Sequence, residues 1–158
     1  PSGQTLDASA GTIAPSVGQV VQVQKNVFDL TGMSTSATSM TDLAPIYVDI
    51  TPVYSNSILI WETCFSGYLN DADGHGRYRV VNANNSDAVL HNNTYCGMSH
   101  YNVGTNTWEN FTFRAVGVSG TTSTMRLHLQ VKVADGGTLS MGWSASDQRI
   151  VTVTEIKQ

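Results

Sequence analysis

The stretch from Met125 to Val133 constrains the fold more than any other part of the chain, because apolar and polar side chains alternate along it without a break. Alternation with a period of two is typical of a β-strand that buries one face. It turns Leu127, Leu129 and Val131 toward a core together with the two end residues, and it places His128 on the opposite, solvent-facing side. No segment carries apolar residues at helical spacing over ten positions. The chain is therefore predicted to be all-β.

Further runs rich in β-branched and aromatic residues recur along the chain, separated by clusters of Gly, Ser, Thr and Asn. Such regular recurrence of short strands is typical of a sandwich. We therefore expect a single antiparallel β-sandwich of jelly-roll type, with strands in segments 19–24, 46–50, 57–65, 77–82, 108–118, 125–133, 138–143 and 150–156.

Four segments carry more detailed expectations. The run from Ser57 to Phe65 begins with apolar residues on both parities, which predicts a central strand covered on two faces. Turn formers from Asn70 to Gly76 predict a hairpin between this strand and the one that begins at Arg77. The segment from Thr31 to Thr41 is predicted to be a loop or a short edge strand. The Asn-rich segment from Asn84 to Asn106 is predicted to form long loops with one or two short strands, and to hold whatever variability and function the loops carry.

The length of 158 residues fits one domain. Residues 1–18 show neither helical nor strand periodicity, so we expect an extended N-terminal arm ahead of a sandwich domain at 19–158. The apolar residues Leu6, Ile13 and Val17 are too sparse for a local core, and they are the kind of isolated anchors with which an extended peptide contacts a neighbouring subunit. A frayed tail is the alternative.

The chain is acidic and poor in charge, with a formal net charge of −4 and only 13% charged residues. A phosphate backbone needs a basic surface, so nucleic acid is not an expected partner. The chain has no apolar run long enough for a membrane span, and its start lacks the regions of a signal peptide. We expect no membrane insertion.

A search for catalytic motifs finds no nucleophile elbow, zinc-protease helix, Cys-x-x-Cys pair or phosphate loop. Asp71, Asp73 and His75 alternate on one turn and are the candidate cation ligands, with a solvated turn as the alternative. A nucleophile pair of Cys96 and His100 lacks an orienting acid. No enzyme activity, no metal and no cofactor are therefore expected.

Several aromatic residues fall in the loop-rich middle of the chain among Asn, Asp and His. Exposed aromatic rings of this kind bind sugars through their flat apolar faces, whereas the alternative is that they fill the core or a subunit contact. The candidates for glycan contact are Tyr68, Tyr78, Tyr95, Tyr101 and Trp108. The two cysteines, Cys64 and Cys96, are compatible with a disulfide or with two free thiols.

Several pieces of the chain, in their order and spacing, resemble the small β-sandwich modules of tail-fibre and other virion-surface proteins of tailed bacteriophages. The segment from Ser66 to Thr107 departs from that pattern, being longer and richer in Asn and Tyr. Together with the spacing between them, the matching pieces cover about two thirds of the chain. They are Gly18 to Gln24, Tyr47 to Pro52 leading to Ser57 to Ile60, Phe111 to Val133 and Val151 to Ile156.

The resemblance implies a non-enzymatic structural protein, displayed on a phage particle as a homotrimeric tail fibre, spike or capsid-decoration protein. It implies assembly with itself and with other virion proteins, host attachment through surface glycans as one role, and synthesis in the host cytoplasm without a signal peptide. A carbohydrate-binding module is the alternative from another class, and a small glycan-degrading enzyme is a further one.

Overall fold

A computed structural model of the protein describes residues 15–30, 32–70, 75–91, 100–101, 108–134, 136–142 and 148–158. These residues form β-strands and one short 3-10 helix, and no helix in them is long and apolar enough to cross a membrane. The elements are β1 (Val20–Asp29), β2 (Met33–Thr35), β3 (Thr41–Ile50), β4 (Ile58–Leu69), β5 (His75–Asn82), η1 (Ala83–Asn85), β6 (Ala88–Val89), β7 (His100–Tyr101), β8 (Glu109–Val118), β9 (Met125–Ala134), β10 (Leu139–Met141) and β11 (Gln148–Ile156).

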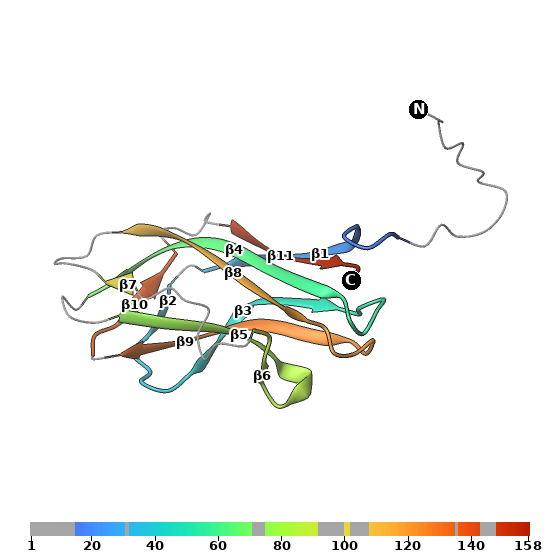
Figure 1. The fold of residues 1–158 in the computed structure, drawn as a ribbon. Helices are drawn as coiled ribbons and strands as arrows, with labels where there is room; N and C mark the ends of the chain where they lie inside the picture. Colours follow the sequence, from blue (N-terminus) through green and yellow to red (C-terminus); the bar gives the residue numbers. More distant parts are fainter. Residues whose placement is uncertain are drawn as a thin grey trace.

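The strands lie in two antiparallel sheets that pack face to face (Figure 1). The first, the β4 sheet, has the order β1-β11-β4-β10-β2, and β8 pairs with β4 as well. The second, the β9 sheet, has the order β3-β9-β5-β6, with β7 also paired to β5. Among the described strands, all neighbours except β5 and β6 are non-consecutive in the chain, as in a jelly roll. The predicted fold class, an antiparallel sandwich of jelly-roll type, is confirmed.

The core lies between the two sheets and follows the alternation of the sequence. All five residues expected to face inward from β9 are buried. Aromatic rings from both sheets meet here: the ring centroid of Phe113 on β8 lies 4.9 Å from that of Phe65 and 4.5 Å from that of Tyr78 on β5. Close aromatic pairs add to the apolar burial that holds the two sheets together.

The turn formers at Asn70 to Gly76 do not make a hairpin, and this prediction is wrong. β4 belongs to the first sheet and pairs with β8, β10 and β11, whereas β5 pairs with β6, β7 and β9 in the second. Turn-forming residues indicate that the chain reverses direction. They do not indicate whether the next strand pairs with the previous strand in the same sheet or belongs to the facing sheet.

The prediction for the Ser/Thr-rich segment is confirmed, and that for the Asn-rich segment is confirmed for its short strands, while residues 92–99 and 102–107 lie outside the described residues. The Ser/Thr-rich segment contains the three-residue strand β2, which pairs with β10 and ends the strand order of its sheet. The Asn-rich segment contains the two-residue strands β6 and β7.

The described part of the arm begins at residue 15. The Gly18 amide donates to the Lys157 carbonyl at 2.7 Å, and the Lys157 amide donates to the Gln19 carbonyl at 3.0 Å, so pairing with the C-terminal end begins here. Val17 is exposed. Leu6 and Ile13 lie outside the described residues, so the arm at 1–18 and its contact with a neighbour stay predictions.

A buried carboxylate closes the end of the sandwich where β3 turns into β4. Glu155 on β11 is fully buried. Its Oε1 accepts hydrogen bonds from the Ser57 hydroxyl at 2.6 Å and from the backbone amides of Val53 and Tyr54 at 2.9 and 3.2 Å. Its Oε2 accepts one from the Gln22 amide at 2.6 Å. Four donors thus compensate the lost hydration of one charge and fasten the turn to both β1 and β11.

Candidate functional site

The outer face of the β4 sheet carries apolar side chains in register across four strands. Residues opposite one another in antiparallel strands point to the same face, so the pairing register defines rows. The first row is Val20, Ile156, Ile58 and Val118. The second row is Val23, Thr154, Ile60 and Val116. We call these two rows the apolar face.

The apolar face is open to solvent in the single chain. The exposed fractions of its four valines are 57% for Val20, 55% for Val23, 46% for Val116 and 54% for Val118. The three isoleucines are half-buried. Scattered exposed valines are ordinary on a protein surface, but seven apolar residues in two adjacent rows form a contiguous patch of the kind that marks an interaction surface.

A charged row borders the apolar face along the same strands. Lys25, Thr152, Glu62 and Arg114 follow one another in register, and the Arg114 guanidinium lies 3.4 Å from the Glu62 carboxylate. The patch therefore has a polar edge on this side, like the polar rim around the core of a protein interface.

The structure corrects the prediction that the strand from Ser57 to Phe65 is covered on two faces. β4 is central, since β8 and β11 pair with its opposite edges. Its inner face, with Leu59, Trp61 and Phe65, is buried, whereas Ile58 and Ile60 on its outer face are only partly buried. The apolar outer parity is therefore surface that one sandwich leaves open.

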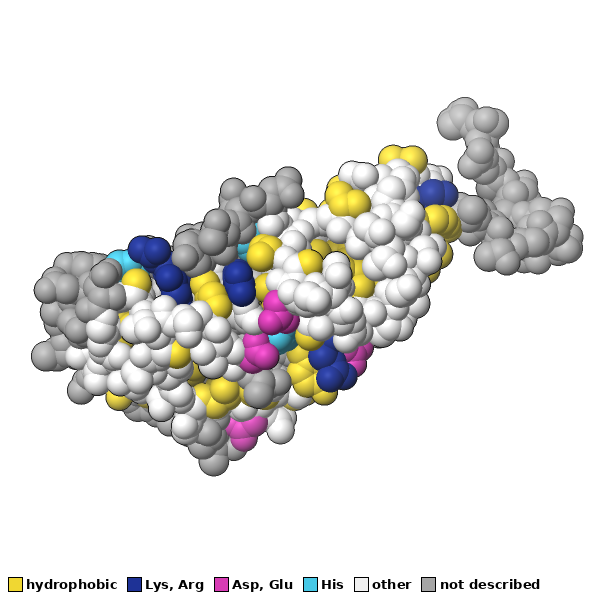
Figure 2. All heavy atoms as spheres, turned by 90° about the horizontal axis from the view of Figure 1, so that it is seen from below, with side chains coloured by type: hydrophobic (Ala, Val, Ile, Leu, Met, Phe, Trp, Pro, Cys, Tyr) yellow, Lys and Arg dark blue, Asp and Glu magenta, His cyan; other side chains and the backbone are white. Residues whose placement is uncertain are grey.

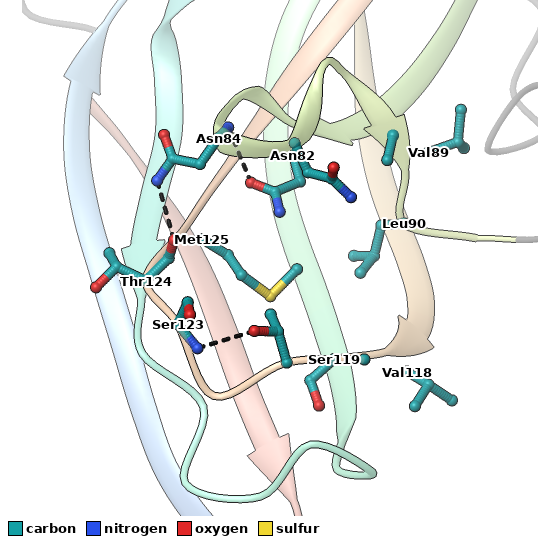
Figure 3. A pocket seen from close by; sticks show the side chains of 13 residues that line it. Asn82, Asn84, Val89, Leu90, Val118, Ser119, Ser123, Thr124 and Met125 are labelled. Carbon is teal, nitrogen blue, oxygen red and sulfur yellow. Dashed lines mark hydrogen bonds between the residues drawn. The ribbon is translucent and has the colours of Figure 1, made fainter.

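A second feature is a cavity of about 460 Å³ at one end of the sandwich. The β8–β9 loop, which passes from one sheet to the other, forms one wall, and the end of β5, η1 and β6 form the opposite wall (Figure 3). None of the lining residues is charged. They are Asn82, Asn84, Asn85, Ala88, Val89, Leu90, Val118, Ser119, Gly120, Thr121, Ser123, Thr124 and Met125.

Hydrogen bonds hold the two walls of the cavity in place. The Asn84 side-chain amide donates to the Thr124 carbonyl at 3.0 Å, which ties η1 to the loop, and the Asn84 backbone amide donates to the Asn82 side chain at 3.1 Å. Within the loop, the Ser123 amide donates to the Thr121 hydroxyl at 3.0 Å, as Figure 3 shows. The cavity is thus formed by bonded, ordered backbone before any ligand arrives.

Close backbone packing lies next to the cavity. A Cβ atom on Gly117, near the end of β8, would lie 1.8 Å from the Leu90 carbonyl oxygen. The segment after β6 can approach β8 this closely only because residue 117 lacks a side chain.

A polar cluster fastens the turn between η1 and β6 to the outer face of the β9 sheet. His128 lies between two carboxylates, with Nδ1 3.5 Å from Asp42 and Nε2 3.3 Å from Asp87. The Gln130 amide donates to both carboxylates, at 2.8 and 3.2 Å, and its oxygen accepts from Arg79 at 2.7 Å. Figure 2 shows acidic and histidine side chains gathered near the middle of this face. We call these five residues the clasp.

The clasp corrects the prediction that His128 is a surface residue: its exposed fraction is only 6%. The turn after η1 places Asp87 against it with a positive φ of 58°, next to Ser86 at 46°, a conformation that non-glycine residues adopt rarely. Ligand atoms of Asp42, Asp87 and His128 lie within 4.8 Å of one another, close enough to hold a cation. Each of these groups already has a hydrogen-bonding partner within the clasp, so the cluster can hold the turn after η1 against β9 without a bound ion.

Comparison with known proteins yields structural neighbours only. No family model matches the chain, and no curated protein matches it. The TNF protein Eiger of S. frugiperda superposes with a TM-score of 0.50 at 11% identity, over 86% of this chain and 92% of that one. A structure of infectious bursal disease virus, Gt strain, gives a TM-score of 0.47 at 9% identity over 99% of this chain, and a mutant VP2 protein of the same virus gives 0.49 at 10% over 99%.

These likenesses bear on the fold. At 11% identity, the match to the TNF protein supports a β-sandwich and nothing about activity or partners. The chain spans about 41% and 40% of the length of the two viral chains, whose TM-scores below 0.5 add no further argument. The comparison therefore supports the β-sandwich fold, and the resemblance to virion-surface modules of tailed phages stays a prediction.

The aromatic residues predicted to contact glycan do not form one platform. Tyr78 is fully buried in the core, so the prediction is wrong for this residue. Tyr68 and Trp108 do meet, with ring centroids 4.8 Å apart, and both are partly exposed. Tyr95 and the side chain of Tyr101 lie outside the described residues.

The remaining predicted sites are largely untested. Asp71 and Asp73 lie outside the described residues, and the ring of His75 lies 3.2 Å from the Arg77 guanidinium. Cys64 is exposed on β4, and Cys96 lies outside the described residues, so their pairing stays open. The side chain of His100 is likewise outside them.

None of the residues that line the cavity is among the predicted site residues. Asn82 ends the predicted strand at 77–82, and Asn84 and Asn85 begin the Asn-rich segment, so this cluster of amides at the end of a strand is the sequence signal for the cavity. The sequence signal for the apolar face is the second apolar parity of β4, which gives the strand from Ser57 to Phe65 more apolar surface than one core uses.

Proposed function

We propose that this protein is a non-enzymatic structural component of a virion surface, and that it assembles with copies of itself through the apolar face. The single observation that carries the proposal is the pair of apolar rows on the outer face of the β4 sheet. An unpaired patch of this composition is stabilised by burial against another surface.

A second copy of the chain is the occupant that fits the apolar face. Burying a valine completely contributes about 1.5–3 kcal/mol, so each half-exposed valine of the face contributes roughly 1 kcal/mol when covered. An uncharged, apolar sheet face can pack against the same face of another copy related by a symmetry axis, because no like charges oppose each other there. Closed symmetric assemblies are also the commonest oligomers of soluble chains. The charged row at its edge limits how far the contact extends.

The finer assignments follow the resemblance to phage surface modules. We propose a homotrimer, displayed as a tail fibre, spike or capsid-decoration protein, with other virion proteins as partners and host surface glycans as a further contact. The arm at 1–18 is proposed as the segment that reaches a neighbouring subunit or the particle. No catalytic role is proposed, since the histidine and carboxylates of the clasp are engaged with one another and with Gln130.

A carbohydrate-binding module is the second candidate, and the uncharged cavity at the end of the sandwich favours it. A glycan array with the isolated protein discriminates the two, because a purely structural protein binds the particle and no sugar. Location of the protein on intact particles, by labelling and electron microscopy, tests the virion assignment directly.

Sedimentation velocity tests the assembly. We expect the wild-type chain to sediment as a trimer at micromolar concentration, and the double variant Val23→Lys/Val116→Lys to sediment as a monomer with an unchanged far-UV spectrum. Lysines on the apolar face place two like charges per copy in the contact and remove its apolar area. The matched control is Val53→Lys, an equally exposed valine at 53% that lies in the turn before β4.

The control variant should assemble like the wild type. A wild-type monomer at these concentrations contradicts the proposal, as does a double variant that folds and keeps the wild-type oligomeric state.

A further inference from the structure

The cavity between the β8–β9 loop and η1 is polar but carries no charge. Its side-chain donors and acceptors are amides and hydroxyls. Such groups both donate and accept hydrogen bonds, so they match ligands whose own groups do both. Phosphate, sulfate and carboxylate ligands are recognised by cationic side chains or by the N-termini of longer helices. No cationic side chain lines this cavity, and its helix, η1, is a 3-10 turn of three residues.

The cavity is lined in part by buried apolar side chains, which we call its floor. They are Leu90 and Met125, which are 8% and 4% exposed, whereas Asn85 and Thr121 bring polar groups from the two walls. A ligand that fits must therefore present an apolar side as well as several hydroxyl or amide groups. The volume of about 460 Å³ lies within the range of small-ligand sites and leaves room for one or two sugar rings, but not for a long chain.

The position of Asn85 makes it the principal free group at this site. It lies on the exposed surface of η1, and its side chain makes no hydrogen bond to the described residues. Asn84 beside it is already bonded to Thr124 and supports the wall. The clasp fixes the turn after η1 through Asp87. The backbone at Asn85 is therefore already ordered, and little conformational entropy is lost there when a ligand binds.

We propose that this cavity is a binding site for one or two residues of a neutral carbohydrate, with Asn85 as a hydrogen-bonding residue and the Leu90–Met125 floor under the apolar side of the sugar ring. The biological role of this site, which is contact with a host glycan, rests on the proposed location of the protein on a virion surface. Binding itself is a property of the isolated chain. The expected dissociation constant is on the order of 1 mM, because a small ligand in an open cavity gains little free energy per contact.

Heteronuclear NMR on the full chain tests the proposal. Labelled protein is titrated with a panel of neutral probes: glucose, galactose, mannose, N-acetylglucosamine, N-acetylgalactosamine and the disaccharides lactose and maltose. We expect at least one to shift the side-chain amide signals of Asn82 and Asn85 together with the backbone signals of the β8–β9 loop. Sialic acid serves as the charged counterpart and should not bind there.

Two variants assign the binding to the cavity. Asn85→Leu should weaken it about fivefold to tenfold, the loss expected for one hydrogen bond to a neutral ligand. Ala88→Phe, which keeps every polar group but fills the space, should abolish it. Asn56→Leu, at an exposed asparagine in the turn before β4, is the control and should bind like the wild type.

Absence of shifts at the cavity with every probe overturns the proposal, and so do shifts that both cavity variants retain with the fold intact. Neither outcome touches the oligomeric state, so loss of the sugar site and loss of the assembly are distinguished. If sugar shifts Tyr68 and Trp108 instead, the site lies at that aromatic pair and the cavity assignment is wrong.

Discussion

Replacing Glu155 tests how one buried charge holds the end of the sandwich together. In Glu155→Gln the side chain keeps its shape, but its new amide nitrogen faces the Gln22 amide nitrogen across the former 2.6 Å hydrogen bond. One charge-assisted bond is lost, at a cost of about 1.5–3 kcal/mol, and the bonds from Ser57, Val53 and Tyr54 go to a neutral acceptor. We expect the free energy of unfolding to fall by about 3 kcal/mol at pH 7.

The pH dependence separates this mechanism from a general packing defect. Burial raises the pKa of Glu155, but hydrogen bonds from Ser57, Gln22 and the backbone amides of Tyr54 and Val53 lower it, and the net effect is a pKa below the ordinary value. A carboxylate with a lowered folded-state pKa stabilises the fold above its unfolded pKa of about 4.3, and this contribution is lost as the pH falls through the folded-state value. The difference between wild type and variant should therefore shrink below about pH 4.

Urea unfolding at fixed protein concentration, followed by the fluorescence of buried Trp61, measures the effect at pH 7 and at steps down to pH 3. Glu62→Gln is the matched control. Glu62 lies on the outer face of β4 with a side chain 46% exposed, so its loss should change stability by less than about 0.5 kcal/mol. A Glu155→Gln variant as stable as wild type at pH 7, or equally destabilised at every pH, would refute the reasoning.

Three further substitutions test other parts of the structure. Gly117→Ala should lower the free energy of unfolding by about 1–3 kcal/mol or more, since its Cβ would meet the Leu90 carbonyl at 1.8 Å; unchanged thermal unfolding would contradict this. Gln130→Leu should cost about 1–3 kcal/mol and speed amide hydrogen exchange in η1 and β6, because both clasp carboxylates lose a shared donor; exchange rates like those of the wild type would count against the clasp. Arg126→Ala should raise the pKa of Asp49 toward its usual value, since the hydrogen bond from Arg126 lowers it; NMR titration of the Asp49 carboxyl measures the change, and an unmoved pKa would show that the ion pair does not form in solution.

The aromatic residues illustrate how far side-chain type alone predicts a site. Tyr78 and Tyr68 look alike in the sequence, yet Tyr78 points into the core from β5 and Tyr68 points outward from β4 beside Trp108. Their strands belong to different sheets, and the parity that faces inward depends on which sheet a strand joins. Composition around a residue therefore could not separate a core ring from a surface ring.

The sequence by itself determined the strands and their inner faces. Alternation along β9 predicted which of its residues are buried, and the turn-rich segments predicted where strands end, because both signals depend only on neighbours along the chain. The tertiary structure decided everything that depends on pairing. Because β4 and β5 belong to different sheets, the segment between them crosses from one sheet to the other and is not a hairpin. Tertiary packing also buries His128 against Asp87 and brings four hydrogen-bond donors to Glu155. Strand pairing aligns valines and isoleucines from four strands on one face. These contacts join residues that are far apart in the sequence. They depend on which strands pair and in which register, and no local sequence pattern encodes that pairing.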